Sequence, residues 1–192
     1  HKLYKARNLA IKKTKGEYIC FLDTDDYWNK NFLNQFIKKF NNKECSIVCS
    51  KYKVRDMKNH KIFDNVKRKL PNVLTTQNLL NDYTIGILAI MLKKKIFNKY
   101  KFNDRYQVIG DFDFFIRLSS KFKIFSLNKS LAVYRLHGDN FSERKIKIYL
   151  SEIDFWFNNF KKKELKKYNL SKIKFLMIKL KIKSKLKKLN LL

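Results

Sequence analysis

Residues 17–28 decide the fold, and they run Glu-Tyr-Ile-Cys-Phe-Leu-Asp-Thr-Asp-Asp-Tyr-Trp. The first half, residues 17–22, is rich in β-forming apolar side chains and predicts a strand buried on both faces. Three aspartates follow within four residues: Asp23, Asp25 and Asp26. Open α/β sheets bind ligands at the carboxyl ends of their strands, so this stretch puts an acidic cluster where a binding site would be.

The acidic cluster has two interpretations from its residues alone. Neighbouring carboxylates repel one another, and a divalent cation relieves that repulsion through oxygen ligands. Magnesium is commonly shared between one or two carboxylates and the phosphates of a substrate, which would make this a metal–diphosphate site. Aspartate also suits polar turns and helix caps, and an acidic triplet without further context favours that plainer role.

Outside the cluster, the apolar pattern alternates between strand and helix. Strands are predicted over residues 17–22, 46–52, 85–92, 123–127 and 131–136, and helices over residues 6–11, 32–40, 77–80, 95–97, 111–120 and 146–160. Residues 53–76 are polar and irregular. This alternation predicts an α/β fold with a mixed, mostly parallel sheet flanked by helices. We divide the chain into one domain, residues 1–142, and a C-terminal amphipathic helix with a basic tail, residues 143–192.

The charge of the chain is large but says little about its partners. The 192 residues include 45 Lys and Arg against 16 Asp and Glu, a formal charge of +29 that ordinarily suggests nucleic acid or an anionic membrane. However, 38 lysines stand beside only seven arginines, and 19 asparagines and 18 isoleucines beside only four alanines. Amino acids with A/T-rich codons are favoured throughout, so compositional drift explains most of the charge. An apolar content of 45% is too high for the whole chain to be a disordered basic segment.

Part of the charge is concentrated at the C-terminus. Residues 161–192 contain 13 lysines and one glutamate, which gives +12 of the +29. Residues 170–192 alternate lysine with apolar side chains, and we favour a helix there because lysine is a poor strand former. Lysines beside apolar residues suit an anionic membrane surface, while a solvated tail enriched by drift is the equal alternative.

The three cysteines, Cys20, Cys45 and Cys49, form no CxxC pair. An odd number without this spacing argues against a disulfide framework or a zinc site. We expect the thiols to pack as small apolar groups in a reducing cytoplasm. No apolar run reaches the roughly 18 residues of a membrane span, and we expect no signal peptide.

Three ordered blocks resemble glycosyltransferase family 2. Residues 6–8, Ala-Arg-Asn, and residues 15–28, which begin Lys-Gly-Glu-Tyr-Ile, are similar to the family's ARN, KGEYI and LDxDD motifs. Residues 102–118 are similar to its FDE and EDYDLWLRL segments, and residues 134–142 to its YRxHxxNxS segment. The resemblance covers residues 4–142 and implies a GT-A fold, a nucleotide-diphosphate sugar donor and a divalent cation, Mn²⁺ or Mg²⁺.

The same resemblance assigns roles to single residues. It implies that Asp111 is the catalytic base of an inverting transfer, without a covalent intermediate. It implies that Asp25 is a metal ligand, and that His137 completes the metal shell or contacts the donor diphosphate. Three further residues are placed at the donor: Arg7, Asp23 (near the ribose) and Arg135.

Structural roles compete with several of these assignments. Arg7 could be a solvated charge on a helix face, and Asp26 could cap the following helix. Arg117 lies four residues beyond Asp113, so an ion pair within one helix is the favoured interpretation for both. Trp28 is either a core residue or a platform for the acceptor.

The chain departs from the family pattern in two places. Gly110 stands where the family usually has glutamate, which affects acceptor contacts or the tuning of Asp111. About the first third of the family's catalytic domain, with its opening strand, PxYN turn and base-reading aspartate, normally precedes the ARN motif. Here the sequence starts at His1, just ahead of that motif. We therefore expect a domain incomplete at its N-terminus, which folds poorly and has little transferase activity alone.

Taken together, these features predict an inverting glycosyltransferase in cell-surface polysaccharide synthesis. It would move a sugar from a nucleotide-diphosphate donor to a glycan or lipid-linked acceptor, in the cytoplasm or peripherally at the inner face of the membrane. One alternative is a truncated, non-catalytic module. A nucleic-acid-binding protein is less favoured, because arginine is rare and the lysines are scattered rather than clustered with stacking aromatics. We therefore expect no nucleic acid partner.

Overall fold

The computed structural model describes residues 3–137, 145–159 and 166–188. The strands are β1 (Tyr18–Cys20), β2 (Tyr27–Trp28), β3 (Ile47–Asp56), β4 (Lys61–Asp64), β5 (Val73–Leu74), β6 (Ile90–Lys93) and β7 (Ile124–Leu136). The α-helices are α1 (Leu3–Lys13), α2 (Phe32–Phe40), α3 (Thr76–Asn81), α4 (Gly110–Ser119), α6 (Ile146–Asn159) and α8 (Ser171–Lys188). Two 3-10 helices, η1 (Ile87–Ala89) and η2 (Lys94–Asn98), flank β6.

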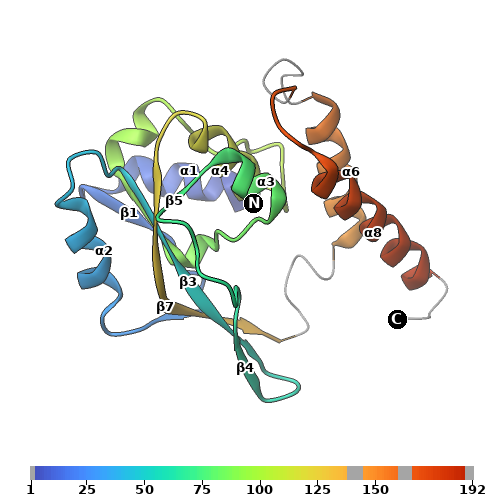
Figure 1. Ribbon diagram of the computed structural model, residues 1–192, viewed down its shortest axis with the longest axis horizontal. Helices are drawn as coiled ribbons and strands as arrows, with labels where there is room; N and C mark the ends of the chain where they lie inside the picture. The colour runs from blue at the N-terminus through green and yellow to red at the C-terminus, as the bar shows by residue number, and fades with distance from the viewer. Residues whose placement is uncertain (1–2, 138–144, 160–165, 189–192) are drawn as a thin grey trace.

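The strands form one seven-stranded sheet in the order β1-β6-β3-β7-β2, with β4 added to β3 and β5 to β7 (Figure 1). The predicted mixed α/β sheet with flanking helices is confirmed. The expectation of mostly parallel pairing is wrong, because only β3 and β7 run parallel and the other pairings are antiparallel. A parallel pair needs a long crossover, which separates β3 from β7, whereas the turn at residues 57–60 forces β4 to run antiparallel to β3.

The sheet has a hydrophobic core on each face. Along β3, Ile47 and Cys49 join the core that contains α1, α4, α6 and α8, while Val48 joins the core under α2. This alternation follows from the two-residue period of a strand. All three cysteines are free, and Cys45 and Cys49 are buried as small apolar groups, as predicted.

Helix α2 covers one face of the sheet through an aromatic stripe. Phe32, Phe36 and Phe40 recur every four residues and are all buried, so the predicted helix over residues 32–40 is confirmed. The Trp28 ring stacks on Phe32 at 4.3 Å, and its Nε1 donates to the Leu88 carbonyl at 2.7 Å. Trp28 is therefore a partly buried residue that packs against the core under α2.

Several predicted strands have different bounds. β1 covers only Tyr18–Cys20, and Leu22 is exposed, so the expected strand over residues 17–22, buried on both faces, is wrong. Of the strand predicted over residues 85–92, Ile87–Ala89 form η1 instead, and β6 begins at Ile90. The two strands expected between residues 123 and 136 are one continuous strand, β7, because register shifts opposite Ser50–Tyr52 of β3 accommodate the polar residues between them. Residues 53–76 hold the end of β3, β4 and β5.

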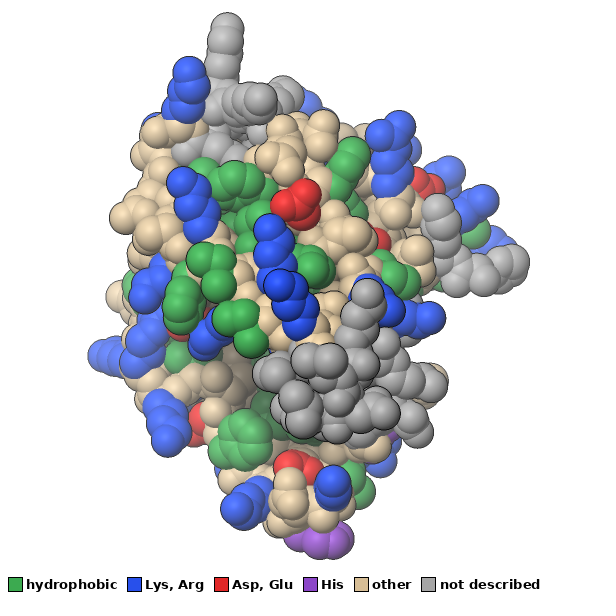
Figure 2. All heavy atoms as spheres, turned by 90° about the vertical axis from the view of Figure 1, so that its right-hand side faces the viewer, with side chains coloured by type: hydrophobic (Ala, Val, Ile, Leu, Met, Phe, Trp, Pro, Cys, Tyr) green, Lys and Arg blue, Asp and Glu red, His purple; other side chains and the backbone are tan. Residues whose placement is uncertain are grey.

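The C-terminal helices α6 and α8 lie side by side and pack on the larger core (Figure 1). Ile153 and Trp156 of α6 and Ile173 and Leu180 of α8 are buried in it. The helical prediction for the basic tail is confirmed. Hydrophobic side chains alternate with lysine and arginine on this side of the molecule (Figure 2). Within the described residues, no helix is long and apolar enough to cross a membrane.

Candidate active site

The acidic loop, residues 23–26, connects β1 to β2 and is held against the end of β7. The Asp26 carboxylate accepts a hydrogen bond from the backbone N–H of Arg135 at 3.0 Å. The Arg135 guanidinium donates in turn to the backbone carbonyl of Asp25. Two segments more than a hundred residues apart in sequence therefore meet at one edge of the sheet.

Asp26 fixes the loop rather than capping a helix. Its side chain is 7% exposed, and burial raises its pKa to about 6. The N-cap position of α2 is Asn31, so the expected capping role of Asp26 is wrong.

Arg7 of α1 forms an ion pair with Asp23 at 3.0 Å. Arg7 is only 9% exposed, and its guanidinium lies over the rings of Tyr4 and Phe21, 5.6 and 5.8 Å from their centroids. The interpretation of Arg7 as a solvated helix-face charge is therefore wrong. Because the Asp23 carboxylate is about half exposed, the pair presents an oxygen acceptor to the solvent side of the loop.

Asp25 and His137, the two predicted metal ligands, lie side by side. His137 Nε2 is 3.0 Å from Asp25 Oδ2, and this hydrogen bond lowers the pKa of Asp25. Carboxylate oxygen and imidazole nitrogen are both ligands for Mn²⁺ and related cations. Among the residues that the structure describes, no three His, Cys, Asp or Glu side chains gather as a set of metal ligands. The remaining residues of the third resembling block, 138–142, lie outside the described residues.

Asp111 lies in the first turn of α4, in a protected environment. Its Oδ1 accepts from the backbone N–H of Phe112 at 2.8 Å and lies 3.2 Å from the Tyr4 hydroxyl, which is also 2.9 Å from the Val108 carbonyl. Burial raises the pKa of Asp111, and the positive charge of Arg7 opposes part of that rise. The result is a positioned carboxylate with increased affinity for a proton.

Gly110 makes room for Tyr4. A Cβ atom at position 110 would lie 2.5 Å from two carbons of the Tyr4 ring, closer than any normal contact. At position 110, where the family usually has glutamate, the Tyr4 ring thus packs over the first turn of α4, and its hydroxyl contacts Asp111.

Glu152 of α6 is a supporting residue that the sequence did not reveal. Its carboxylate accepts hydrogen bonds from three consecutive backbone N–H groups, those of Gln107, Val108 and Ile109, at 2.6, 2.9 and 3.1 Å. The carboxylate therefore binds the N-cap N–H of α4 and the two N–H groups before it, and its negative charge interacts favourably with the positive N-terminal end of the helix dipole. Because Glu152 comes from another helix, no local capping pattern could have identified it.

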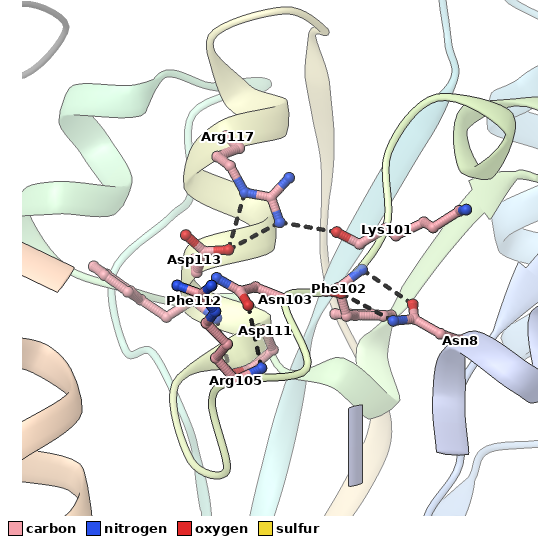
Figure 3. Close-up of polar contacts among 9 residues, drawn as sticks. All are labelled: Asn8, Lys101, Phe102, Asn103, Arg105, Asp111, Phe112, Asp113 and Arg117. Carbon is pink, nitrogen blue, oxygen red and sulfur yellow. Dashed lines mark hydrogen bonds and ion pairs between the residues drawn. The ribbon is translucent and has the colours of Figure 1, made fainter. Parts of the chain in front are cut away.

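The other charged residues of α4 are structural (Figure 3). Asp113 and Arg117 form the predicted intrahelical ion pair at 2.8 Å, and Arg117 also donates to the Lys101 carbonyl at 2.9 Å. The Asn8 side chain pairs with both the N–H and the carbonyl of Phe102, at 3.1 and 2.9 Å. Asn8 therefore ties the first resembling block to the second.

A cavity of about 700 Å³ opens beside this cluster. Four carboxylates line it: Asp23, Asp26, Asp82 and Asp111. Lys172 and Lys179 of α8 also line it. Asp82 forms an ion pair with Arg68 at 2.9 Å. The hydroxyl of Tyr83, another lining residue, is buried and has no hydrogen-bond partner within the described part of the chain. Of the other predicted site residues, Asp25 belongs to the acidic loop, and Arg7, Arg135 and His137 contact that loop. These four residues are not among those that line the cavity.

The fold and the site together define the GT-A class. The structure is similar to the crystal structure of S. aureus TarS residues 1–349 in complex with UDP, with 21% identity, a TM-score of 0.52, and coverage of 78% of this chain and 44% of that one. TarS 1–349 in a second crystal structure gives a TM-score of 0.56 at 17% identity, over 81% of this chain and 45% of that one.

The chain belongs to the family described as Glycosyl transferase family 2, which matches residues 1–121. It is 26% identical over 143 residues to the putative teichuronic acid biosynthesis glycosyltransferase TuaG of Bacillus subtilis, covering 74% of this chain and 56% of TuaG. It is 28% identical over 144 residues to the Escherichia coli UDP-Glc:alpha-D-GlcNAc-diphosphoundecaprenol beta-1,3-glucosyltransferase WfgD, covering 74% of this chain and 54% of WfgD. The chain thus spans about half the length of the curated relatives it matches.

Proposed function

We propose that the protein transfers a sugar from a nucleotide-diphosphate donor to a glycan or lipid-linked acceptor in cell-surface polysaccharide synthesis. The observation that carries the proposal is the cavity in which Asp111 faces the acidic loop, in a chain of glycosyl transferase family 2. The names of TuaG and WfgD, an enzyme of teichuronic acid biosynthesis and one that acts on a diphosphoundecaprenol-linked sugar, support the choice of acceptor.

In this proposal Asp111 is the general base. It takes the proton of an acceptor hydroxyl while that oxygen forms a bond to the anomeric carbon of the donor sugar. The bond from that carbon to the diphosphate oxygen breaks, and the diphosphate leaves with the electron pair. A single displacement of this kind inverts the anomeric configuration. Burial favours the role, because it raises the pKa of the carboxylate towards the operating pH of the enzyme.

The donor would lie against the acidic loop. Arg7 and Arg135 contribute positive charge beside the loop, and Asp23 offers an exposed carboxylate oxygen to a ribose hydroxyl. The ion pair with the buried Arg7 side chain keeps the Asp23 side chain in place before the donor arrives, which lowers the entropic cost of binding.

Asp25 and His137 would hold the divalent cation, Mn²⁺ or Mg²⁺. Their donor atoms lie 3.0 Å apart and both side chains are partly exposed, so the pair can serve as two ligands while phosphate oxygens and water complete the shell. When bound, the cation neutralises charge that develops on the leaving diphosphate.

We place the reaction at the cytoplasmic face of the membrane, with the lysines of α8 that lie outside the cavity towards anionic lipid and no nucleic acid partner. Each lysine near such a surface contributes about 1 kcal/mol to attraction. An interfacial helix of this kind is held by charge and a modest apolar area together.

A transfer assay on the full-length protein tests the proposal. Candidate nucleotide-diphosphate sugars are supplied with Mn²⁺ or Mg²⁺, and the product's anomeric configuration is read by NMR. Asp111→Asn should lower kcat by about 10²–10⁴-fold, the usual contribution of a general base. Asp25→Asn should raise the concentration of metal that transfer requires, because a proposed ligand is lost. Asp154→Asn, a control change in α6, should have little effect on the rate. Wild-type rates in both Asp111→Asn and Asp25→Asn would refute the assignment, and retention of configuration would refute the inverting step.

A further inference from the structure

Helix α8 has two apolar faces instead of one. Ile173 and Leu180 are seven residues apart and buried in the core. On the opposite side, Phe175, Ile178 and Ile182 follow the i, i+3, i+7 spacing of a single helix face and are each 54% exposed. Apolar side chains therefore lie on two opposite sides of this lysine-rich helix.

Lysines border the exposed face on both sides. At 100° per residue, Lys172 and Lys179 fall on one border, and Lys181 and Lys185 fall on the other. Only the first pair lines the cavity that contains Asp111, together with Phe175 of the exposed face. The face of the molecule in Figure 2 carries such lysine and hydrophobic side chains next to one another.

The cavity therefore changes in character from one side to the other. Near α4 it presents the Asp111 carboxylate and the buried, unpartnered hydroxyl of Tyr83. These groups suit the hydroxyls of a neutral sugar, because a buried hydroxyl without a partner gains a hydrogen bond when one binds. At α8 it presents two ammonium groups and apolar side chains, which suit an anion attached to a hydrocarbon.

We infer that α8 is the acceptor-binding wall of the site, and that Lys172 and Lys179 bind the phosphate of an acceptor sugar linked through phosphate to a lipid. The inference rests on the proposed function and adds the acceptor's chemical class and its contacts. The sugar reaches towards Asp111, the phosphate lies between the two lysines, and the lipid chain leaves along Phe175, Ile178 and Ile182.

Kinetics with two acceptors that share one sugar test this assignment in the full-length protein. One acceptor is the sugar on a short isoprenyl diphosphate, and the other is its neutral octyl glycoside. Lys172→Gln/Lys179→Gln should raise KM for the first acceptor at least about tenfold, as expected for lost charge-assisted hydrogen bonds. KM for the glycoside and for the donor should stay within about twofold. Because both acceptors are short-chain and no membrane is present in the assay, Lys181→Gln/Lys185→Gln, with the same charge change, should behave as wild type. An increased KM for the donor would instead assign the lysines to the donor and overturn the inference.

A binding measurement keeps the test independent of turnover. Farnesyl phosphate is titrated calorimetrically in EDTA, so that no metal-held site takes the phosphate. The wild type should bind it at least about tenfold more tightly than Lys172→Gln/Lys179→Gln, and no more than about threefold more tightly than Lys181→Gln/Lys185→Gln. Equal losses in the two double variants, or equal binding of inorganic phosphate, would overturn the inference. If the wild type binds farnesyl phosphate in this manner yet transfers no sugar, the proposed function fails while the phosphate site stands.

Discussion

The Glu152 carboxylate accepts a hydrogen bond from the backbone N–H of Ile109 at 3.1 Å, which fixes the N-terminus of α4 to α6. Ile109 is the N-cap residue of the helix that carries Asp111, and it has no side-chain cap of its own. The position of the proposed base therefore depends on a residue in the C-terminal part of the chain.

Replacing this carboxylate tests its positioning role. In Glu152→Gln the side-chain NH₂ group replaces one carboxylate oxygen, so that a donor would face a backbone N–H donor. We expect Asp111 to be misplaced as a result and kcat to fall about tenfold or more. The loss of charge-assisted hydrogen bonds should lower the free energy of unfolding by roughly 1.5–3 kcal/mol. Donor KM should stay unchanged, because the proposed donor residues lie in or beside the acidic loop and do not contact Glu152. A parallel rise in donor KM would indicate general disruption, and Asp154→Asn on the same helix is the matched control.

The ionised Asp111 side chain, which the proposed reaction requires, should lower the free energy of unfolding. Because burial raises its pKa above the ordinary value near 3.8, the folded protein binds the proton more tightly than the unfolded chain does. Stability contributed by this group is therefore present below the ordinary pKa and is lost as pH rises through the raised pKa. Asp111→Asn should raise Tm at neutral pH by about 2–4 °C for each kcal/mol gained.

The pH dependence of Tm separates the titration of Asp111 from a general effect of the substitution on stability. The Tm advantage of Asp111→Asn should vanish in acid and grow across the window above pH 4, while wild-type transfer rises over the same window as the base ionises. Asp104→Asn, an exposed change seven residues earlier, should show no such trend. A constant difference in Tm at every pH would contradict the assigned titration.

Gly110 should tolerate no side chain while Tyr4 is present. The Cβ atom of Gly110→Ala would meet the Tyr4 ring at 2.5 Å, and we expect a loss of roughly 1–3 kcal/mol in the free energy of unfolding. In a Tyr4→Ala background the same change should cost much less, so that urea unfolding of the four variants shows positive coupling. Gly16→Ala, whose Cβ would make an ordinary 3.5 Å contact, is the control. Additive effects would show that the ring moves aside freely.

Tyr83 should matter to the substrate and not to the fold. Its buried hydroxyl has no partner among the described residues, so Tyr83→Phe removes an unsatisfied group and should leave Tm the same or slightly higher. Acceptor KM should rise about 2–10-fold if the hydroxyl bonds to an acceptor sugar. Tyr100→Phe, whose ring packs against Phe122 instead of the cavity, should change neither quantity. A clear drop in Tm for Tyr83→Phe would mean that the hydroxyl serves the fold.

The sequence predicted correctly those helices whose apolar residues repeat with a clear helical spacing. The aromatic stripe of α2 and the helix that carries Asp111 were found almost to the residue, since a helical period repeated over two or more turns has few alternatives. The strand limits were less accurate, because β7 and β3 form one long ladder only through register shifts that no local pattern encodes.

The candidate site followed the same division. The acidic loop, the aspartate of α4 and the Asp113–Arg117 pair could be predicted from the sequence, because each depends on neighbouring residues. The room that Gly110 leaves for the Tyr4 ring, and the approach of Glu152 and the lysines of α8 to the surroundings of Asp111, became visible only in the three-dimensional structure. The physical reason is that these contacts join elements far apart in sequence, so that packing and shape, rather than residue spacing, determine which side chains meet.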